Sequence, residues 1–277
     1  MFGETDRVER NRFVVDPQAG ALVGDRWGGS GPTAVFLHAG ITDRRAWTAT
    51  IEALGGKVAA IAYDRRGFGE TPPAQSAFSQ VDDLLAVLGD QGDGSPVWLV
   101  GNSAGGGIAL EAACREPDRI AGLVLIAPAV TGAPDFTLDP DSTRLDEALE
   151  AADGRGDLDE VNRLELHLWL DGPAQPEGRV GGSARQLVEE MNRTVLANEQ
   201  IGVQPTRGEP VWGRLGEIRQ PVLVLCGSFD LPHLLARSRD LAAALPAGRY
   251  EDLPGTAHLP QLEQPDEVAR RIAQLIN

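Results

Sequence analysis

The sequence has very few of the residues on which several kinds of chemistry depend. It contains a single lysine, Lys57, so an enzyme that forms a lysine imine would have to use this residue, which stands at the start of a predicted strand. Its two cysteines, Cys114 and Cys226, cannot build a disulfide framework and lack metal-site spacing, so we expect buried free thiols. Imine chemistry, a disulfide scaffold and a cysteine metal site are therefore set aside.

Basic charge and long apolar runs are also scarce. The chain has 41 acidic against 25 basic residues, a net charge of −16, which argues against binding to nucleic acid or to an anionic membrane. No apolar run approaches membrane-spanning length and no signal-peptide pattern opens the chain, so we expect a cytoplasmic protein. Without a dinucleotide fingerprint or a metal-binding cluster, we expect no cofactor and no metal. The expected partner is a small-molecule substrate, bound by a monomer or a homodimer.

Residues 98–107 are the stretch on which the rest of the interpretation depends. They are typical of a buried strand that runs into a helix, with Ser103 at the apex of the turn between Gly101 and Gly105. A serine on such a strained turn presents its hydroxyl above the sheet, and the amide of Ala104 faces whatever reacts with it. Three glycines in the first helical turn predict a close approach to the sheet or to a ligand. The alternative is a glycine-rich turn with an unreactive serine.

Apolar runs on both sides of this stretch predict an α/β fold. Continuous runs, which are typical of strands covered on both faces, occur at residues 34–37, 58–63, 97–100, 123–127 and 221–227. Shorter strands are predicted at 8–15, 21–27 and 249–253, and helices at 47–54, after Ser79, after Ser103, at 234–245 and from Pro265. The sequence thus predicts a mostly parallel central sheet of about eight strands with helices on both faces.

Residues 131–209 break this alternation. Strand-like runs vanish there, and apolar residues recur at helical spacing around 158–169 and 187–196. The segment is too long for a loop. We therefore predict a helical cap at 131–209, inserted into a core made of residues 1–130 and 210–277 and covering the open end of the sheet.

Three residues able to act in catalysis follow predicted strands at the edge where parallel strands end. They occur in the order Ser103, Asp230, His258, which is the order expected on an α/β-hydrolase sheet. Further motifs stand at 38–40 (HAG), 64–69 (DRRGFG), 101–105 (GNSAG), 227–230 (GSFD) and 255–258 (GTAH). On these motifs the chain resembles the α/β-hydrolase fold superfamily over essentially its full length, with a helical cap after the sixth strand.

This constellation predicts nucleophilic catalysis by a serine. A neutral His258 would take the proton of Ser103 as it attacks a carbonyl and later return it to the leaving group, while Asp230 holds the imidazole in the required tautomer. The amide of Ala104 would meet the oxygen anion, and the resemblance implies the amide of Gly40 as the second donor.

Other residues near these motifs have competing interpretations. His38 is expected to brace the oxyanion loop, in which Ala39 replaces the family's usual glycine. His233 follows Asp230 too closely to be its partner. The turn at 64–66 is interpreted as an ion-paired turn. The candidates for substrate contact are Ile41, Asn102, His167 and Trp169, of which the last two fit helix packing as well.

A serine nucleophile excludes the haloalkane dehalogenase branch and argues against epoxide hydrolases, because both attack with an aspartate. A cap with leucine, tryptophan and methionine predicts an apolar pocket of modest size. We therefore favour an α/β-fold serine hydrolase of small carboxylic esters or lactones. Three alternatives of the same fold stay open, namely a carbon–carbon bond hydrolase, a thioesterase and a peptidase. The absence of His-Gly-Gly-Pro at 38–41 argues against the peptidase. The alternative from another class is a slow-turnover ligand receptor or signalling protein.

Overall fold

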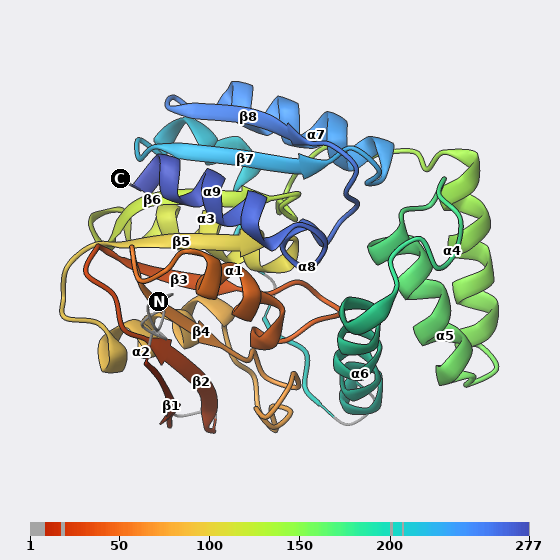
Figure 1. Ribbon diagram of the computed structural model, residues 1–277, viewed down its shortest axis with the longest axis horizontal. Helices are drawn as coiled ribbons and strands as arrows, with labels where there is room; N and C mark the ends of the chain where they lie inside the picture. Colours follow the sequence, from red (N-terminus) through yellow and green to blue (C-terminus); the bar gives the residue numbers. More distant parts are fainter. Residues whose placement is uncertain (1–8, 18–19, 200–201, 207, 277) are drawn as a thin grey trace, which may run out of the picture.

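The computed structural model describes residues 9–17, 20–199, 202–206 and 208–276 (Figure 1). Within this part of the chain eight strands form one sheet in the order β1-β2-β4-β3-β5-β6-β7-β8. Only β2 runs against its neighbours, and the other pairs are parallel. The strands are β1 (Arg10–Val15), β2 (Leu22–Trp27), β3 (Thr33–Leu37), β4 (Ala59–Tyr63), β5 (Val97–Asn102), β6 (Ile120–Ile126), β7 (Val222–Gly227) and β8 (Gly248–Leu253). The predicted α/β sheet is confirmed, while Val8 lies outside the described residues.

Helices cover both faces of the sheet, which explains the continuous apolar runs. One face packs against α2 (Gln80–Gln91), α3 (Ala104–Arg115) and α7 (Pro232–Ala244). The other packs against α1 (Thr48–Ala53) and α9 (Pro265–Ile276). Neighbouring residues of one strand therefore enter different apolar clusters, so that both must be hydrophobic. Short helices η1 (Arg44–Trp47), η2 (Pro117–Arg119), η4 (Trp212–Glu217) and α8 (Pro260–Glu263) lie between these elements.

The segment between β6 and β7, the proposed cap, is helical and contains α4 (Pro140–Asp153), α5 (Leu158–Glu165), η3 (Leu166–Asp171) and α6 (Gly182–Glu199). These helices lie beyond the ends toward which β5 and β7 point (Figure 1). The predicted single helix over 158–169 is instead an α-helix followed by the π-helical turn η3. Its wider turn ends at Gly172, whose φ of +95° brings it against the carbonyl of Phe229.

The order of the strands places two loops side by side at the cap end of the sheet. From β3 the chain moves to β4 on one side and later to β5 on the other, so the strand order reverses between β3 and β5. Leu37 at the end of β3 pairs with Gly101 near the end of β5. Open parallel sheets bind their ligands at such a reversal, in the crevice beyond the carboxyl ends of the strands.

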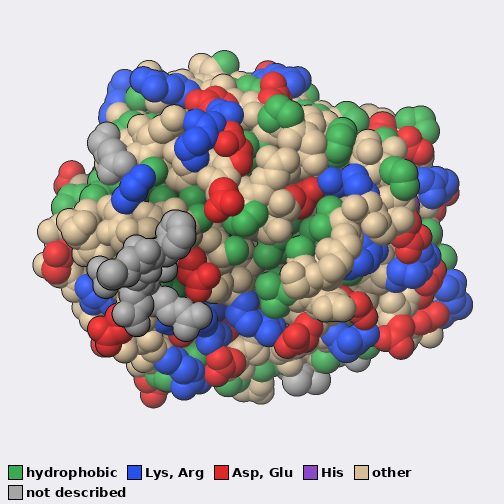
Figure 2. All heavy atoms as spheres, viewed as in Figure 1, with side chains coloured by type: hydrophobic (Ala, Val, Ile, Leu, Met, Phe, Trp, Pro, Cys, Tyr) green, Lys and Arg blue, Asp and Glu red, His purple; other side chains and the backbone are tan. Residues whose placement is uncertain are grey.

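One face of the molecule shows how its charges are distributed. Acidic and basic side chains intermingle over the face in Figure 2. Among the helices of the described residues, none combines the length and the hydropathy that a membrane crossing needs.

Candidate active site

Ser103 lies at a sharp turn between β5 and α3. Its φ of 52° and ψ of −115° place a non-glycine residue in a strained region of backbone space. Such strain costs about 1–3 kcal/mol and persists only where the surroundings impose it. Here the Ser103 amide donates to the carbonyl of Ile126 at 2.9 Å, and the Ser103 carbonyl accepts from Gly107 at 3.1 Å and Ala129 at 2.9 Å. The turn is therefore fixed by β6 and the loop that follows it.

The glycines around Ser103 are required by close packing of backbone. A Cβ on Gly101 would lie 2.5 Å from the carbonyl oxygen of Gly105, and one on Gly105 would lie 2.2 Å from that of Leu37. The next two glycines press on the loop after β6, where Cβ atoms would meet Pro128 and Ala129. The expected close approach is thus explained by contact with the protein's own backbone, which lets α3 begin directly above β3 and β5.

His258 and Asp230 meet above the ends of β7 and β8. The imidazole Nδ1 lies 2.8 Å from the Asp230 Oδ2, and the Asp230 Oδ1 accepts from the amide of Leu231 at 2.8 Å. Both residues are buried, with 3% and 4% of their surfaces exposed. A carboxylate at Nδ1 favours the tautomer with its proton on that nitrogen, which leaves Nε2 as the proton acceptor. The buried thiol of Cys226 also approaches Oδ2, at 3.6 Å, and burial raises its pKa, so the thiol stays neutral beside the carboxylate.

The two loops that carry these residues are joined to each other and to the serine strand. The amide of Phe229 donates to the carbonyl of Thr256 at 2.8 Å. Asn102, next to Ser103, donates through Nδ2 to the carbonyls of Ile126 and His258, each at 3.1 Å, and its Oδ1 accepts from Gln261 at 3.0 Å. Asn102 is fully buried, so it positions the histidine loop, and the substrate contact expected of it has no support in this geometry.

The two amides expected to form an oxyanion hole belong to the turns after β5 and β3. Ala104 is the first residue of α3, and first-turn amides have no acceptor inside their helix. In the loop after β3, the carbonyl of Ala39 accepts from His38 Nδ1 and from Arg65 Nη2, both at 2.9 Å. Because a trans peptide directs its N–H opposite to its carbonyl, the Gly40 amide points away from those two donors. Ala39 therefore leaves the expected donor, Gly40, available.

The structure separates the remaining histidines by their contacts. His38 braces the loop as expected, since it is fully buried and its Nε2 accepts from the Arg65 amide at 3.0 Å. Burial, with the nearby Arg65 cation, holds the pKa of His38 well below 6.5, so the ring is neutral. His233 stacks on Phe136, with ring centroids 3.8 Å apart, and within the described part of the chain it makes no hydrogen bond to Asp230. His167 donates through Nε2 to the carbonyl of Gln175 at 2.9 Å.

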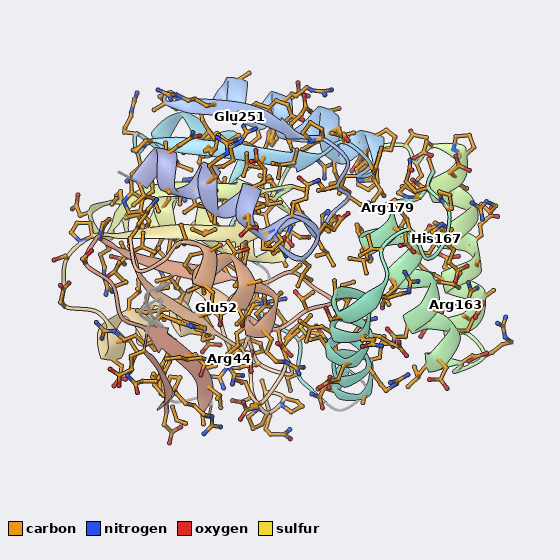
Figure 3. All side chains as sticks on the ribbon, viewed as in Figure 1. Arg44, Glu52, Arg163, His167, Arg179 and Glu251 are labelled. Carbon is orange, nitrogen blue, oxygen red and sulfur yellow. The ribbon has the colours of Figure 1, made fainter. Side chains whose placement is uncertain are left out.

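The cap reaches the site through Trp169 and closes over Ile41. The Trp169 ring centroid lies 4.7 Å from that of His258, and the Trp169 carbonyl accepts from the His258 amide at 3.1 Å. Ile41 packs with Leu166, Met191 and other cap residues in an apolar cluster. Among the four residues expected to contact substrate, Trp169 contacts His258 and Ile41 packs beside the candidate oxyanion residue Gly40, while His167 lies in the helical segment between β6 and β7, where Figure 3 labels it. Within the described residues no three His, Cys, Asp or Glu side chains could hold a metal.

The charged turn at 64–66 differs from the expectation in one respect. Asp64 pairs with Arg44, and Arg66 makes two hydrogen bonds of 2.8 Å to Asp83, so both are ion-paired. Arg65 has no carboxylate within 4.0 Å among the described residues, and the ion-paired interpretation is wrong for it. The sequence gives no means of distinguishing the two adjacent arginines. They differ only in the partners that their side chains reach from the turn.

Similar proteins share this architecture. The chain is 36% identical to lipase LipV of Mycobacterium tuberculosis over 56% of its own length and 64% of LipV. It is 25% identical to a pimeloyl-[acyl-carrier protein] methyl ester esterase of Nitrosomonas europaea over 86% of its length and 93% of that enzyme. Carboxylesterase CesB of Bacillus subtilis superposes with a TM-score of 0.74 at 22% identity, covering 98% of this chain and 93% of that one. Residues 34–271 match the model of the alpha/beta hydrolase family, and with the sheet, the serine turn and these relatives in agreement the chain belongs to that family.

Proposed function

We propose that this protein hydrolyses small carboxylic esters or lactones through an acyl-enzyme on Ser103, with His258 as general base and acid and Asp230 as its partner. The observation that carries the proposal is the 2.8 Å contact between His258 and Asp230, in a loop that is tied to the serine turn through Asn102, the residue before Ser103. Serine, histidine and acid thus come from three strand ends that the sheet holds together.

In the acylation step, the Ser103 Oγ attacks the carbonyl carbon of the substrate. Its proton passes to Nε2 of His258, and the imidazolium is stabilised by Asp230. The carbonyl electrons move onto oxygen, where the amides of Ala104 and Gly40 would each contribute about 3 kcal/mol of transition-state stabilisation. Collapse of this intermediate expels the alcohol, which takes its proton from His258.

In the deacylation step, a water molecule gives its proton to His258 Nε2 and attacks the acyl carbon. The carbon–Oγ bond then breaks, Ser103 recovers the proton, and the carboxylic acid leaves. With a lactone the two products remain one hydroxy acid, because the expelled alcohol is tethered to the acyl group. The same catalytic residues would act on esters and on lactones, so the proposed substrate class includes both.

The cap supports a small apolar substrate. Its helices pack Trp169 and Met191 near Ile41 of the loop after β3, and Trp169 contacts His258. We propose that residues 131–209 act as this cap on a catalytic core made of residues 1–130 and 210–277. A cap of this kind excludes polymers and favours ligands that can be enclosed.

The test compares wild type with Ser103→Ala on short-chain 4-nitrophenyl esters and on lactones. Wild type should turn over, and the variant should lose at least about 10³-fold in kcat. Intact mass of wild type mixed with a slow ester should show one acyl group, located on Ser103 by peptide mapping. Binding of a small molecule without turnover by wild type would instead favour the receptor alternative, and activity unchanged in Ser103→Ala would overturn the proposal.

A further inference from the structure

A cavity lies beside the loop after β3, and His258 is not among its lining residues in the described part of the chain. Its volume is about 220 Å³, and its walls come from the turn after β4, from α6 and from residues 202–205. Gly40 forms part of its wall, together with Arg65, Phe68, Phe78 and Val195. The cavity therefore shares one residue, Gly40, with the proposed oxyanion hole. It is too small for a whole drug-sized ligand and fits one end of a substrate.

Arg65 is a buried cation in this wall. Only 5% of its surface is exposed, and its Nε is buried without a hydrogen-bond partner. One Nη donates to the carbonyl of Ala39 at 2.9 Å, and the guanidinium carbon lies 4.1 Å from the centroid of the Phe68 ring. Neither contact supplies a negative charge, and no carboxylate of the described residues lies within 4.0 Å of it.

The nearby carboxylates are already paired. Asp64 binds Arg44 and accepts from two backbone amides, and Asp83 accepts two hydrogen bonds from Arg66. Burial lowers the pKa of Arg65 to about 10, which still leaves the side chain charged at neutral pH. A buried charge without a partner is strongly unfavourable, and proteins keep one where a ligand supplies the missing charge.

We propose that Arg65 forms a subsite for a free carboxylate carried by the ester or lactone substrate. The planar guanidinium fork matches a carboxylate in shape and in hydrogen-bond geometry. A phosphate dianion would call for a second cation, and the neighbouring Arg66 is already committed to Asp83. The small cavity limits the carboxylate to a short chain, so the substrate class is a monoester, or a lactone acid, derived from a small dicarboxylic acid or from a hydroxy acid.

This inference rests on the proposed hydrolase function and sharpens its substrate class. The first experiment compares substrates of equal shape that differ in charge. 4-Nitrophenyl glutarate is matched with 4-nitrophenyl 5-methylhexanoate, which places the charge in the acyl half. 4-Acetoxybenzoate is matched with 4-acetoxyacetophenone, which places it in the leaving group. Wild type should prefer the anionic member of one pair. The pair that shows this preference identifies whether Arg65 binds the acyl half or the leaving group of the substrate.

Arg65→Met should lower kcat/KM for the preferred anionic substrate by about 30-fold, chiefly through KM, with a much smaller loss on its neutral match. Arg65→Lys should restore part of the preference. Arg270→Met is the matched control, since it removes a positive charge from the exposed face of α9, where the residue pairs with Glu267. It should leave the preference unchanged. An equal loss on charged and neutral substrates would overturn the proposal, because Arg65 would then act only through the Ala39 peptide.

A second measurement does not depend on turnover. Glutarate should raise the melting temperature of Ser103→Ala and should have no effect on Ser103→Ala/Arg65→Met. The same absence of effect in both proteins would count against the carboxylate subsite. If Ser103→Ala abolishes ester hydrolysis while glutarate and the substrate pairs show no dependence on Arg65, the hydrolase function stands and the subsite fails. If glutarate binding depends on Arg65 but wild type hydrolyses no ester, the hydrolase function fails instead.

Discussion

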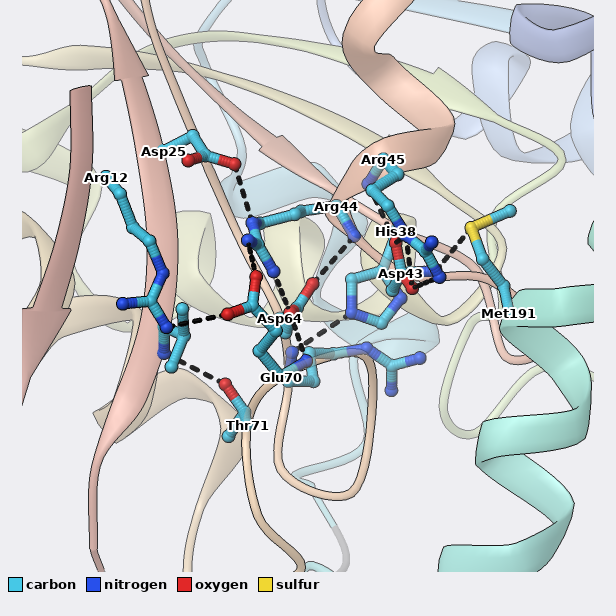
Figure 4. A network of polar contacts seen from close by, with 12 residues as sticks. Arg12, Asp25, His38, Asp43, Arg44, Arg45, Asp64, Glu70, Thr71 and Met191 are labelled. Carbon is cyan, nitrogen blue, oxygen red and sulfur yellow. Dashed lines mark hydrogen bonds and ion pairs between the residues drawn. The ribbon is translucent and has the colours of Figure 1, made fainter. Parts of the chain in front are cut away.

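The two sides of the site are held in different ways. On the side of the oxyanion loop, buried ion pairs join elements of the core to one another. Arg44, at the start of η1, donates to Asp25 of β2 at 2.7 Å and pairs with Asp64 after β4 (Figure 4). All three side chains have at most 5% of their surfaces exposed. The loop from β3 is thus fixed by charges that belong to the sheet and its nearest turns.

On the histidine side, several of the contacts come from the cap. The His258 amide donates to the carbonyl of Trp169. Arg179, which Figure 3 labels at the junction of cap and core, donates to the carbonyl of Gly255 at 3.1 Å and pairs with Glu263 at 2.5 Å. Glu263 in turn accepts from the amide of Ala257 at 2.7 Å. The loop that carries His258 is therefore shared between core and cap.

Because of this difference, substitutions on the two sides should affect different properties of the protein. A lost contact on the oxyanion side leaves a buried charge inside the core, so its effect should appear in the free energy of unfolding. A lost contact on the histidine side displaces a loop that still has core contacts, so its effect should appear in kcat first. Substitutions on the two sides can test this division between stability and activity, and the largest effect is expected on the oxyanion side.

Arg44→Met should lower the free energy of unfolding by about 3–5 kcal/mol, because it leaves Asp64 buried without its cation and leaves Asp25 with only the half-exposed Arg10. Urea unfolding followed by circular dichroism measures this. The control is Arg12→Met, which removes an arginine from an exposed pair with Glu70 and should cost at most about 1 kcal/mol. Equal losses in the two variants would remove the basis for treating the oxyanion side as the rigid one.

His38 should make the stability of the oxyanion side depend on pH. In the folded protein its pKa lies well below 6.5, whereas the unfolded chain takes up a proton near that value. Between these two values the unfolded state binds more protons, so the contribution of His38 is complete above pH 6.5 and is lost as the pH falls, at up to about 1.4 kcal/mol per pH unit. The free energy of unfolding, measured at pH 5, 6 and 7, should therefore fall more with decreasing pH in wild type than in His38→Asn. Parallel pH dependence would contradict a neutral buried ring.

The sequence was sufficient for the sheet and for the order of the catalytic candidates. Apolar runs such as 222–227 identify strands because both faces of the sheet are covered, and glycines at 101 and 105 identify the turn because backbone passes within contact distance of each. These signals are local. They also fix which strand ends carry Ser103, Asp230 and His258, since each lies in the loop or turn that follows a strand.

Side-chain partners across long sequence distances could not be predicted. Arg65 and Arg66 are neighbours in one turn, yet only the packed structure shows that Asp83 pairs with the second and leaves the first alone. The same holds for the π-helical turn η3, since the repeat around residues 158–169 fits an ordinary helix. The contacts of the cap with the histidine loop depend on that irregular turn. No pattern in the sequence predicts the turn.

The smallest expected effect concerns Arg179. Arg179→Lys keeps a cation beside Glu263 but loses the guanidinium fork, which also donates to the carbonyls of Leu170 and Asp171 at 2.8 Å and 2.6 Å. We expect kcat for a neutral ester to fall by about 5- to 10-fold with little change in KM, because the histidine loop gains freedom while the pocket keeps its walls.

The matched control is Arg163→Lys in the same cap, where the arginine pairs at the surface with Glu160 and Glu177. It should change neither kcat nor KM, since its contacts do not reach the core. The melting temperature of Arg179→Lys should stay close to that of the control, because the core does not depend on this contact to fold. A fall in melting temperature with unchanged kcat would reverse the division, making the cap a source of stability and leaving the histidine loop positioned by the core alone.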